Sequence, residues 1–191
     1  SVVLYLFLGS IVTKIGYEYK NKIGVAEIRG GRRGPENVWG SAATGLFLAL
    51  MIRFNLADLV VLKLGFAASF VAKLADTFGS EIGKRFGKNT FMITTLKKVE
   101  RGTEGAISLE GTFASLLGSI LMTIIMFLLG FVTTQKQLII VSACGFVATI
   151  LESYIGANFQ ERFNMSNELV NTIQTSISAT LTIVFYTLFF Y

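Results

Sequence analysis

The sequence contains no histidine, a single cysteine and a single proline among its 191 residues. The missing histidine excludes Ser-His-Asp triads, Cys-His dyads and histidine-bound metals, so any chemistry must rely on carboxylates, lysine, arginine, hydroxyls or amides. One cysteine cannot form a disulfide within the chain, which excludes a disulfide-stabilised secreted domain. Charged residues are also scarce, at 15% of the chain against roughly 25% in an ordinary soluble domain.

Apolar residues are abundant instead: 52% of the chain is hydrophobic and the mean hydropathy is +0.62. This composition excludes a disordered chain. A membrane-spanning helix needs about 20 mostly apolar residues, and six segments are candidates: 2–16, 41–54, 59–82, 112–132, 138–157 and 169–191. The sequence therefore predicts the all-α class, a polytopic membrane protein with a single catalytic domain over residues 1–191 and about six transmembrane helices. The first segment is shorter than a full span at its N-terminal end. We therefore expect a further hydrophobic segment upstream.

The basic residues are distributed unevenly along the chain, whose net charge is +5. Of the 17 basic residues, 13 lie in the loops 14–36, 83–104 and 158–168, which the predicted spans place on one side of the membrane. The positive-inside rule makes this side cytoplasmic, or stromal in a plastid. Such an excess in so apolar a chain favours a membrane-facing or phosphate-facing surface, and we expect no nucleic-acid partner.

Polar side chains within the predicted spans are sorted onto single helical faces. The third span carries Lys73, Asp76, Thr77, Ser80, Glu81 and Lys84 in one arc. Smaller polar faces include Ser115 in the fourth span, Glu152 in the fifth and Asn171 in the sixth. We expect these groups to converge on one water-filled cavity, because carboxylates inside a membrane are costly and usually functional. The alternative is a polar seam between helices with no chemistry.

The segment 76–112 carries the residues most indicative of chemistry. Two acids at the end of a predicted helix are followed by Gly-Lys-Arg-Phe-Gly-Lys at 83–88, a Lys-Lys pair at 97–98 and Arg-Gly-Thr-Glu-Gly at 101–105. Glycines let the backbone approach an anion, basic residues neutralise it, and nearby acids hold the Mg²⁺ that accompanies a nucleotide phosphate. These features predict a phosphoryl-transfer site. A solvated basic loop is the alternative, and the glycine spacing does not match a P-loop.

Three strings in this segment resemble one integral membrane family: D-T-F-G-S-E-I-G-K at 76–84, I-T-T-L-K-K-V at 93–99 and G-T-E-G-A-I-S-L-E-G-T at 102–112. This family includes the plant phytyl-phosphate kinase of vitamin E synthesis, and R-G-P-E-N-V-W-G-S-A at 33–42 is similar to its photosynthetic branch. The resemblance implies transfer of a phosphate from CTP or another nucleoside triphosphate to an isoprenyl monophosphate such as phytyl phosphate. It also implies a bacterial inner, thylakoid or plastid membrane, contact with membrane lipid, and a more distant similarity to polyprenol kinases and CDP-diacylglycerol synthases.

On this hypothesis each candidate residue has a role. The expected catalytic residues are Asp76, Glu81, Lys84 and Glu104, with Asp76 and Glu81 as ligands of Mg²⁺. The expected ligands of the nucleotide phosphates are Gly83, Arg85, Gly87, Lys88, Lys97, Lys98, Gly102, Thr103 and Gly105. The acceptor phosphate is assigned to Arg32, Arg33 and Asn37, and supporting roles to Lys73, Thr112, Glu152, Ser153, Asn167 and Asn171.

Two other classes of function remain open from the sequence. Polar stripes and intramembrane charges also suit a transporter or channel. A cytidylyltransferase that forms a CDP-lipid and releases pyrophosphate would use a similar set of residues.

Overall fold

The structure, a computed structural model, describes residues 1–27 and 35–190, except for the side chains of residues 35–37 and 41. Its helices are α1 (Val2–Lys14), α2 (Tyr17–Lys22), α3 (Pro35–Arg53), α4 (Leu59–Phe86), α5 (Leu109–Leu128), α6 (Gln135–Ile155) and α7 (Asn167–Phe190). A π-helical turn, Gly156–Gln160, continues α6, and two short strands, β1 (Phe91–Met92) and β2 (Ala106–Ile107), pair in the loop between α4 and α5. The predicted all-α class is confirmed, and the six predicted segments correspond to α1 and α3–α7.

Helix α4 is the central element, and it packs against α1, α3, α5, α6 and α7. Most of its residues from Leu62 to Ala75 are buried, and many of them are small, which allows neighbouring helices to approach closely. At Gly79, for example, an added Cβ atom would lie 2.0 Å from Oγ of Ser115 on α5. Because other helices surround this part of α4, it presents apolar residues in several directions and not along one stripe.

Three helices of the described part of the chain are long and apolar enough to cross a membrane. They are α5, α6 with its π-helical extension, and α7. Helices α1 and the apolar part of α3, Ala42–Arg53, are shorter. Helix α4 is not one of these three. It carries charged residues on the polar face that the sequence indicated.

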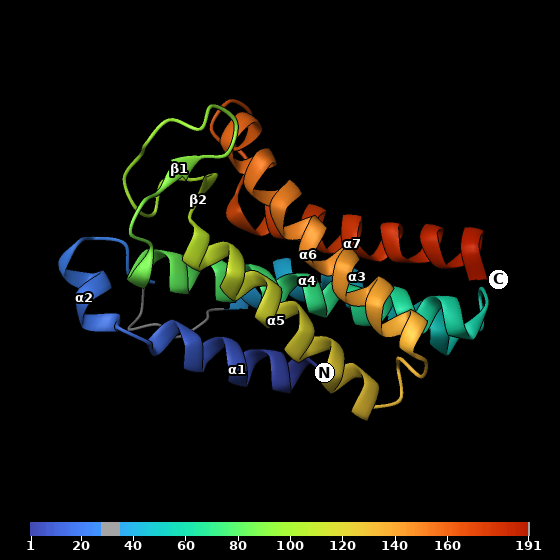
Figure 1. Cartoon of the computed structure of the whole chain (residues 1–191). Coiled ribbons are helices and arrows are strands. Elements are labelled where there is room, and N and C mark those ends of the chain that lie inside the picture. Colours follow the sequence, from blue (N-terminus) through green and yellow to red (C-terminus); the bar gives the residue numbers. More distant parts are fainter. Residues whose placement is uncertain (28–34, 191) are drawn as a thin grey trace.

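The ends of the helices are fixed by local signals. Pro35 begins α3, a position where its missing N–H is not needed. The side chain of Asp58 accepts hydrogen bonds from the backbone N–H groups of Val60 and Val61 and caps α4. The hydroxyl of Ser108 accepts a bond from the N–H of Gly111 and caps α5. Figure 1 shows that α2 and the loop with β1 and β2 lie at one end of the bundle, and the α5–α6 turn at the other.

Candidate active site

A cavity of about 170 Å³ lies at the end of the bundle that carries β1 and β2. Its walls come from the C-terminal half of α4, the loop 101–108, the N-terminal turns of α5 and α7, and the C-terminal half of α6. Pockets that enclose a whole ligand usually measure roughly 300–1,000 Å³. This cavity is therefore too small to enclose a whole ligand of that size, part of which would lie outside it.

A buried charged network forms one wall of the cavity. The ammonium of Lys73 donates to Oδ2 of Asp76 over 2.6 Å and to Oδ1 of Asn171 on α7 over 2.6 Å. Lys73 is buried, whereas the Asp76 side chain keeps 16% of its surface exposed. A lysine inside a membrane protein is stable only when it is paired in this way. The network therefore joins α4 to α7 and holds the Asp76 carboxylate at the edge of the cavity.

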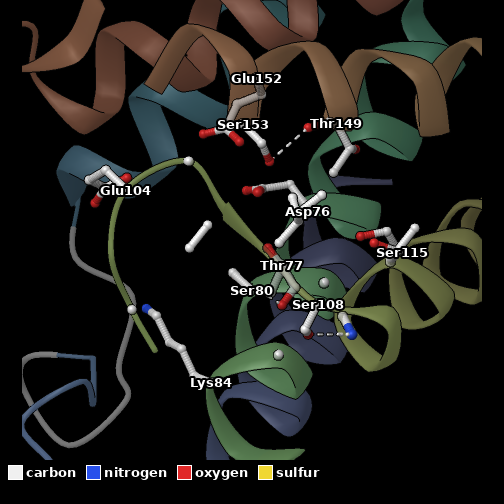
Figure 2. A pocket seen from close by; sticks show the side chains of 18 of the residues that line it. Asp76, Thr77, Ser80, Lys84, Glu104, Ser108, Ser115, Thr149, Glu152 and Ser153 are labelled. Atoms are coloured by element: carbon white, nitrogen blue, oxygen red, sulfur yellow. Dashed lines mark hydrogen bonds between the residues drawn. The ribbon is translucent and has the colours of Figure 1, made fainter. Parts of the chain in front are cut away.

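Carboxylates from three elements face the same space: Asp76 from α4, Glu104 from the loop and Glu152 from α6 (Figure 2). Desolvation is the largest cause of a raised pKa at Glu104. The Lys84 ammonium lowers that pKa, and the charges of Asp76 and Glu27 raise it. The acids are thus close enough to repel one another, an arrangement that a cation between them would stabilise.

Two helix N-termini and a set of hydroxyls complete the cavity. The first turns of α5 and α7 contribute Ser108, Gly111, Thr112 and Asn167 to its lining. The N-terminus of a helix carries a partial positive charge and favours anions. Lys84 extends from α4 toward the loop opposite, and Arg101 joins it from that loop (Figure 2 shows Lys84). The cavity therefore offers groups that bind anions beside groups that bind cations.

Magnesium fits these residues under one condition. Among residues 1–27 and 35–190, no group of three or more acidic or cysteine side chains is placed to hold a metal alone. Mg²⁺ usually keeps several waters and is held by one or two carboxylates together with substrate phosphates. Asp76 with Glu104 or Glu152 supplies those carboxylates once a phosphate is present.

A second, more open depression, the outer hollow, adjoins the cavity on the loop side. It is lined by Ile23, Val25, Lys88, Thr90, Lys98, Val99, Glu100 and Arg101, of which Thr90 and Arg101 also line the cavity. Arg101 is held between the two by a 2.9 Å hydrogen bond from Nη1 to the Tyr19 hydroxyl on α2. The two spaces thus share Thr90 and Arg101 as a common border.

The integral membrane family DUF92 matches residues 1–181 of the chain. The chain belongs to this family. The resemblance to it that the sequence motifs indicated is confirmed. No solved structure matches the chain.

Three relatives of this DUF92 protein cover most of its length. It is 46% identical over 184 residues to an uncharacterized membrane protein of Synechocystis, covering 95% of this chain and 71% of the relative. It is 40% identical over 188 residues to Protein VTE6, chloroplastic, of Arabidopsis thaliana, covering 95% of this chain and 56% of the relative. An uncharacterized membrane protein of Methanocaldococcus jannaschii is 30% identical over 182 residues, with 95% of this chain and 73% of the relative covered.

Most of the predicted site residues of the DUF92 protein do meet at the cavity. Its lining includes Lys73, Asp76, Gly83, Lys84, Gly102, Thr103, Glu104, Gly105, Thr112, Glu152, Ser153, Asn167 and Asn171. Lys88 and Lys98 line the outer hollow instead. Arg32 and Arg33 lie outside the described residues, as does the side chain of Asn37.

Glu81 requires a correction, because the expectation that it shares a cavity with Asp76 is wrong. Its side chain is buried in an ion pair with Lys20 of α2 and does not line the cavity. Five residues along a helix turn the side chain by about 140° from that of Asp76. The polar face predicted from the sequence was too wide, and the carboxylates of Asp76 and Glu81 do not face one common space.

Three other predicted phosphate ligands also lie away from the cavity. The Arg85 guanidinium stacks over the rings of Tyr19 and Phe86, at 4.6 and 4.8 Å from their centroids. Gly87 ends α4 and packs against Ser108. Lys97 is exposed and lines neither space.

Some lining residues had no role in the sequence hypothesis. Thr77, Ser80, Ser115 and Thr149 lie on the polar faces that the helical periodicity indicated, so their position had a signal. Ser108 had one too, as a serine just before an apolar helix. Glu27, Thr90 and Arg101 reach the site only through tertiary folding of the loops.

Proposed function

We propose that this protein is a membrane kinase that transfers the terminal phosphate of a nucleoside triphosphate to an isoprenyl monophosphate. The observation that carries the proposal is the cavity itself. There Lys73, Lys84 and Arg101 and two helix N-termini meet four carboxylates, those of Glu27, Asp76, Glu104 and Glu152. Phosphoryl transfer needs this combination, because two anionic substrates must be brought together and a negatively charged transition state must be stabilised.

The choice of substrates rests on similarity. The sequence motifs resemble the family that includes the plant phytyl-phosphate kinase, and the 40% identity to Protein VTE6 supports the same branch. Phytyl phosphate and CTP are therefore the proposed acceptor and donor. Because the match spans 56% of that relative, the activity of the whole protein is part of the proposal. The proposed location of the site is the cytoplasmic or stromal face of the membrane.

In the proposed reaction an oxygen of the acceptor phosphate attacks the γ-phosphorus of the donor. The bond between that phosphorus and the β–γ bridging oxygen breaks, and the nucleoside diphosphate leaves with the bonding electrons. The acceptor oxygen is already anionic, so no general base is required, which suits a chain without histidine. The products are an isoprenyl diphosphate and CDP.

The residues of the chain bring the two anions together. Lys84 and Arg101 neutralise the donor phosphates, whose path from the surface passes Lys88 and Lys98 in the outer hollow. Lys73 holds Asp76 in place, and the N-terminus of α5 faces the acceptor phosphate. Mg²⁺ held by Asp76 with Glu104 or Glu152 would neutralise charge on the donor phosphates.

Product analysis with purified protein in detergent or liposomes tests the function directly. Radiolabelled CTP or ATP is incubated with phytyl phosphate or geranylgeranyl phosphate, and the lipid and nucleotide products are separated by thin-layer chromatography. An isoprenyl diphosphate with CDP is the expected result. A CDP-lipid with pyrophosphate would identify a cytidylyltransferase, and substrate uptake without nucleotide a transporter.

The first prediction concerns Asp76. Asp76→Asn should lower the rate of phosphate transfer by about 100-fold or more. It removes the carboxylate that Lys73 positions, next to the place where negative charge develops on the phosphates in the transition state. Lys73 keeps its hydrogen bond to Asn171, and thermal unfolding of the purified variant checks that the protein is still folded. Glu161→Gln, an exposed acid beyond the cavity, is the matched control and should leave the rate unchanged. An active Asp76→Asn variant would contradict the assignment.

A further inference from the structure

Helices α5 and α6 run antiparallel beside the cavity, and their contact differs along its length. Toward the middle of the bundle, Oγ of Ser119 and Oγ of Ser142 lie 3.3 Å apart and close the seam. One helical turn nearer the site, Ser115 on α5 and Phe146 on α6 both line the cavity. A further turn on, Thr112 and Ile150 do the same. Helices α5 and α6 therefore contact each other at the two serines. Nearer the site, the same two helices form one wall of the cavity.

Two of the apolar lining residues, Phe146 and Ile150, lie at this wall, and the other two belong to β2. Among the described residues of the lining, the apolar side chains are Ala106, Ile107, Phe146 and Ile150. The faces of α4 and α7 that border the cavity are polar, with Lys73, Asp76 and Asn171. A polar cavity thus has one apolar helical side, which belongs to α6 where it faces α5.

Ile150 also belongs to the outer surface of the bundle. It is 40% exposed, and its neighbours Val147 and Leu151 on α6 are exposed as well. Across the seam, Phe113 and Leu116 of α5 are exposed apolar residues. Helices α5 and α6 are both long and apolar enough to cross a membrane, so these side chains face lipid. The cavity consequently borders the hydrocarbon region at Ile150.

We propose that the α5–α6 cleft, defined by Thr112, Ser115, Phe146 and Ile150, admits the acceptor's hydrocarbon chain sideways from the bilayer. The phosphate head group then lies beside Asp76 at the N-terminus of α5, while the chain leaves between Phe146 and Ile150 into lipid. This inference rests on the proposed function and names the acceptor as a phosphorylated lipid with a long apolar chain. Phe146 and Ile150 are specificity-determining residues.

The chemistry of the acceptor explains why such an opening is needed. Each methylene moved from lipid into water costs free energy, so a long isoprenyl chain remains in the bilayer while its phosphate reacts. The nucleotide is fully water-soluble and approaches through the outer hollow, whose cations Lys88, Lys98 and Arg101 lie on the loop side. The two substrates reach Asp76 from different phases and do not compete for one entrance.

Narrowing the cleft tests the inference through chain length. Ile150→Trp should raise KM for phytyl phosphate by about tenfold or more, the effect that a few misplaced methylenes have in an apolar site. KM for the nucleotide and kcat/KM for the short, water-soluble acceptor dimethylallyl phosphate should not change. Ile139→Trp, an exposed position on α6 far from the cavity, is the matched control for both acceptors. An equal loss with both acceptors, or no loss with either, would overturn the inference.

A binding measurement separates the inference from the proposed function. An alkyl monophosphate with a photoreactive diazirine near its phosphate end is crosslinked to the wild-type protein, and labelled peptides are identified by mass spectrometry. Labelling of residues 112–117 and 146–151 supports the cleft even if no phosphate is transferred. Labelling confined to α1, α3 or α7 would contradict it, whether or not the protein is an active kinase.

Discussion

Two buried lysine–carboxylate pairs lie on different sides of α4 and have different surroundings. The pair of Lys73 with Asp76 borders the cavity, and Asp76 keeps part of its surface open to it. The pair of Lys20 with Glu81 is sealed, because both side chains are almost completely buried. A carboxylate at the edge of a cavity is able to exchange a protein partner for a ligand, whereas a sealed pair serves packing. This difference supports the proposed catalytic role of Asp76 and a structural role for Glu81.

Glu104 gives a prediction that depends on pH. Its pKa in the folded protein is raised by desolvation and by the nearby acids. As pH rises, the unfolded chain therefore loses this proton first, and the folded state loses stability until Glu104 ionises there too. Glu104→Gln removes this loss. It should leave thermal stability unchanged at about pH 4 and increase it slightly at about pH 7, by less than about 1 kcal/mol because Glu104 is exposed.

Thermal unfolding in detergent micelles, followed by fluorescence, measures the effect at both pH values. Glu161→Gln replaces an exposed acid in the loop before α7 and is the matched control. Stabilisation by Glu104→Gln at acidic rather than neutral pH would contradict the raised pKa.

At the scale of elements, the short helix α2 stabilises the site through contacts that lie outside the cavity. Besides pairing with Glu81, the Lys20 ammonium donates to the backbone oxygen of Thr13 over 2.8 Å, which ties the end of α1 to α4. Tyr19 of the same helix accepts a hydrogen bond from Arg101. The six-residue helix α2 thus connects the end of α1, helix α4 and the loop that carries Arg101.

The stability of this connection can be measured with a double-mutant cycle. Lys20→Met should destabilise the protein by about 3 kcal/mol or more, because it leaves Glu81 buried without a partner. The double variant Lys20→Met with Glu81→Gln should recover much of that loss, since both charges are gone. Unfolding in micelles gives the free energies for the cycle.

The same double variant tests the correction made for Glu81. If Glu81 serves only packing, the folded double variant keeps the proposed kinase activity of the wild-type protein. A stable double variant without activity would return Glu81 to the catalytic residues.

How far the sequence could predict these elements depends on the range of the interactions. The apolar runs predicted six helices, and the helical period placed Lys73, Asp76 and Lys84 on one face because both are local properties. The partner of Glu81 could not be predicted, since Lys20 lies 61 residues away in a segment expected to be a loop. Residues 101–108 fold back over the cavity because β1 pairs with β2, and each of these strands has only two residues. Strands so short have no recognisable pattern.

At the scale of the whole molecule, the site lies at the end of the bundle where the basic loops gather. The loop between α4 and α5 crosses this end, and the α5–α6 turn lies at the opposite end (Figure 1). The nucleotide of the proposed reaction is made in the cytoplasm or stroma and does not cross a bilayer, so on this proposal the cavity opens to that side. The positive-inside rule gives the same orientation independently.

Labelling of single cysteines in intact cells tests this orientation. Lys97→Cys places a thiol in the exposed loop at the cavity end, and Gln135→Cys places one at the start of α6 at the other end. A maleimide that does not cross membranes should label Gln135→Cys in intact cells and Lys97→Cys only after the membrane is opened, because the sequence predicts 13 of the 17 basic residues, and Lys97 with them, on the cytoplasmic or stromal side. The native Cys144 is buried in α6, and Cys144→Ser supplies the background. Labelling of Lys97→Cys from outside would place the cavity on the side without nucleotide, where the proposed kinase has no donor.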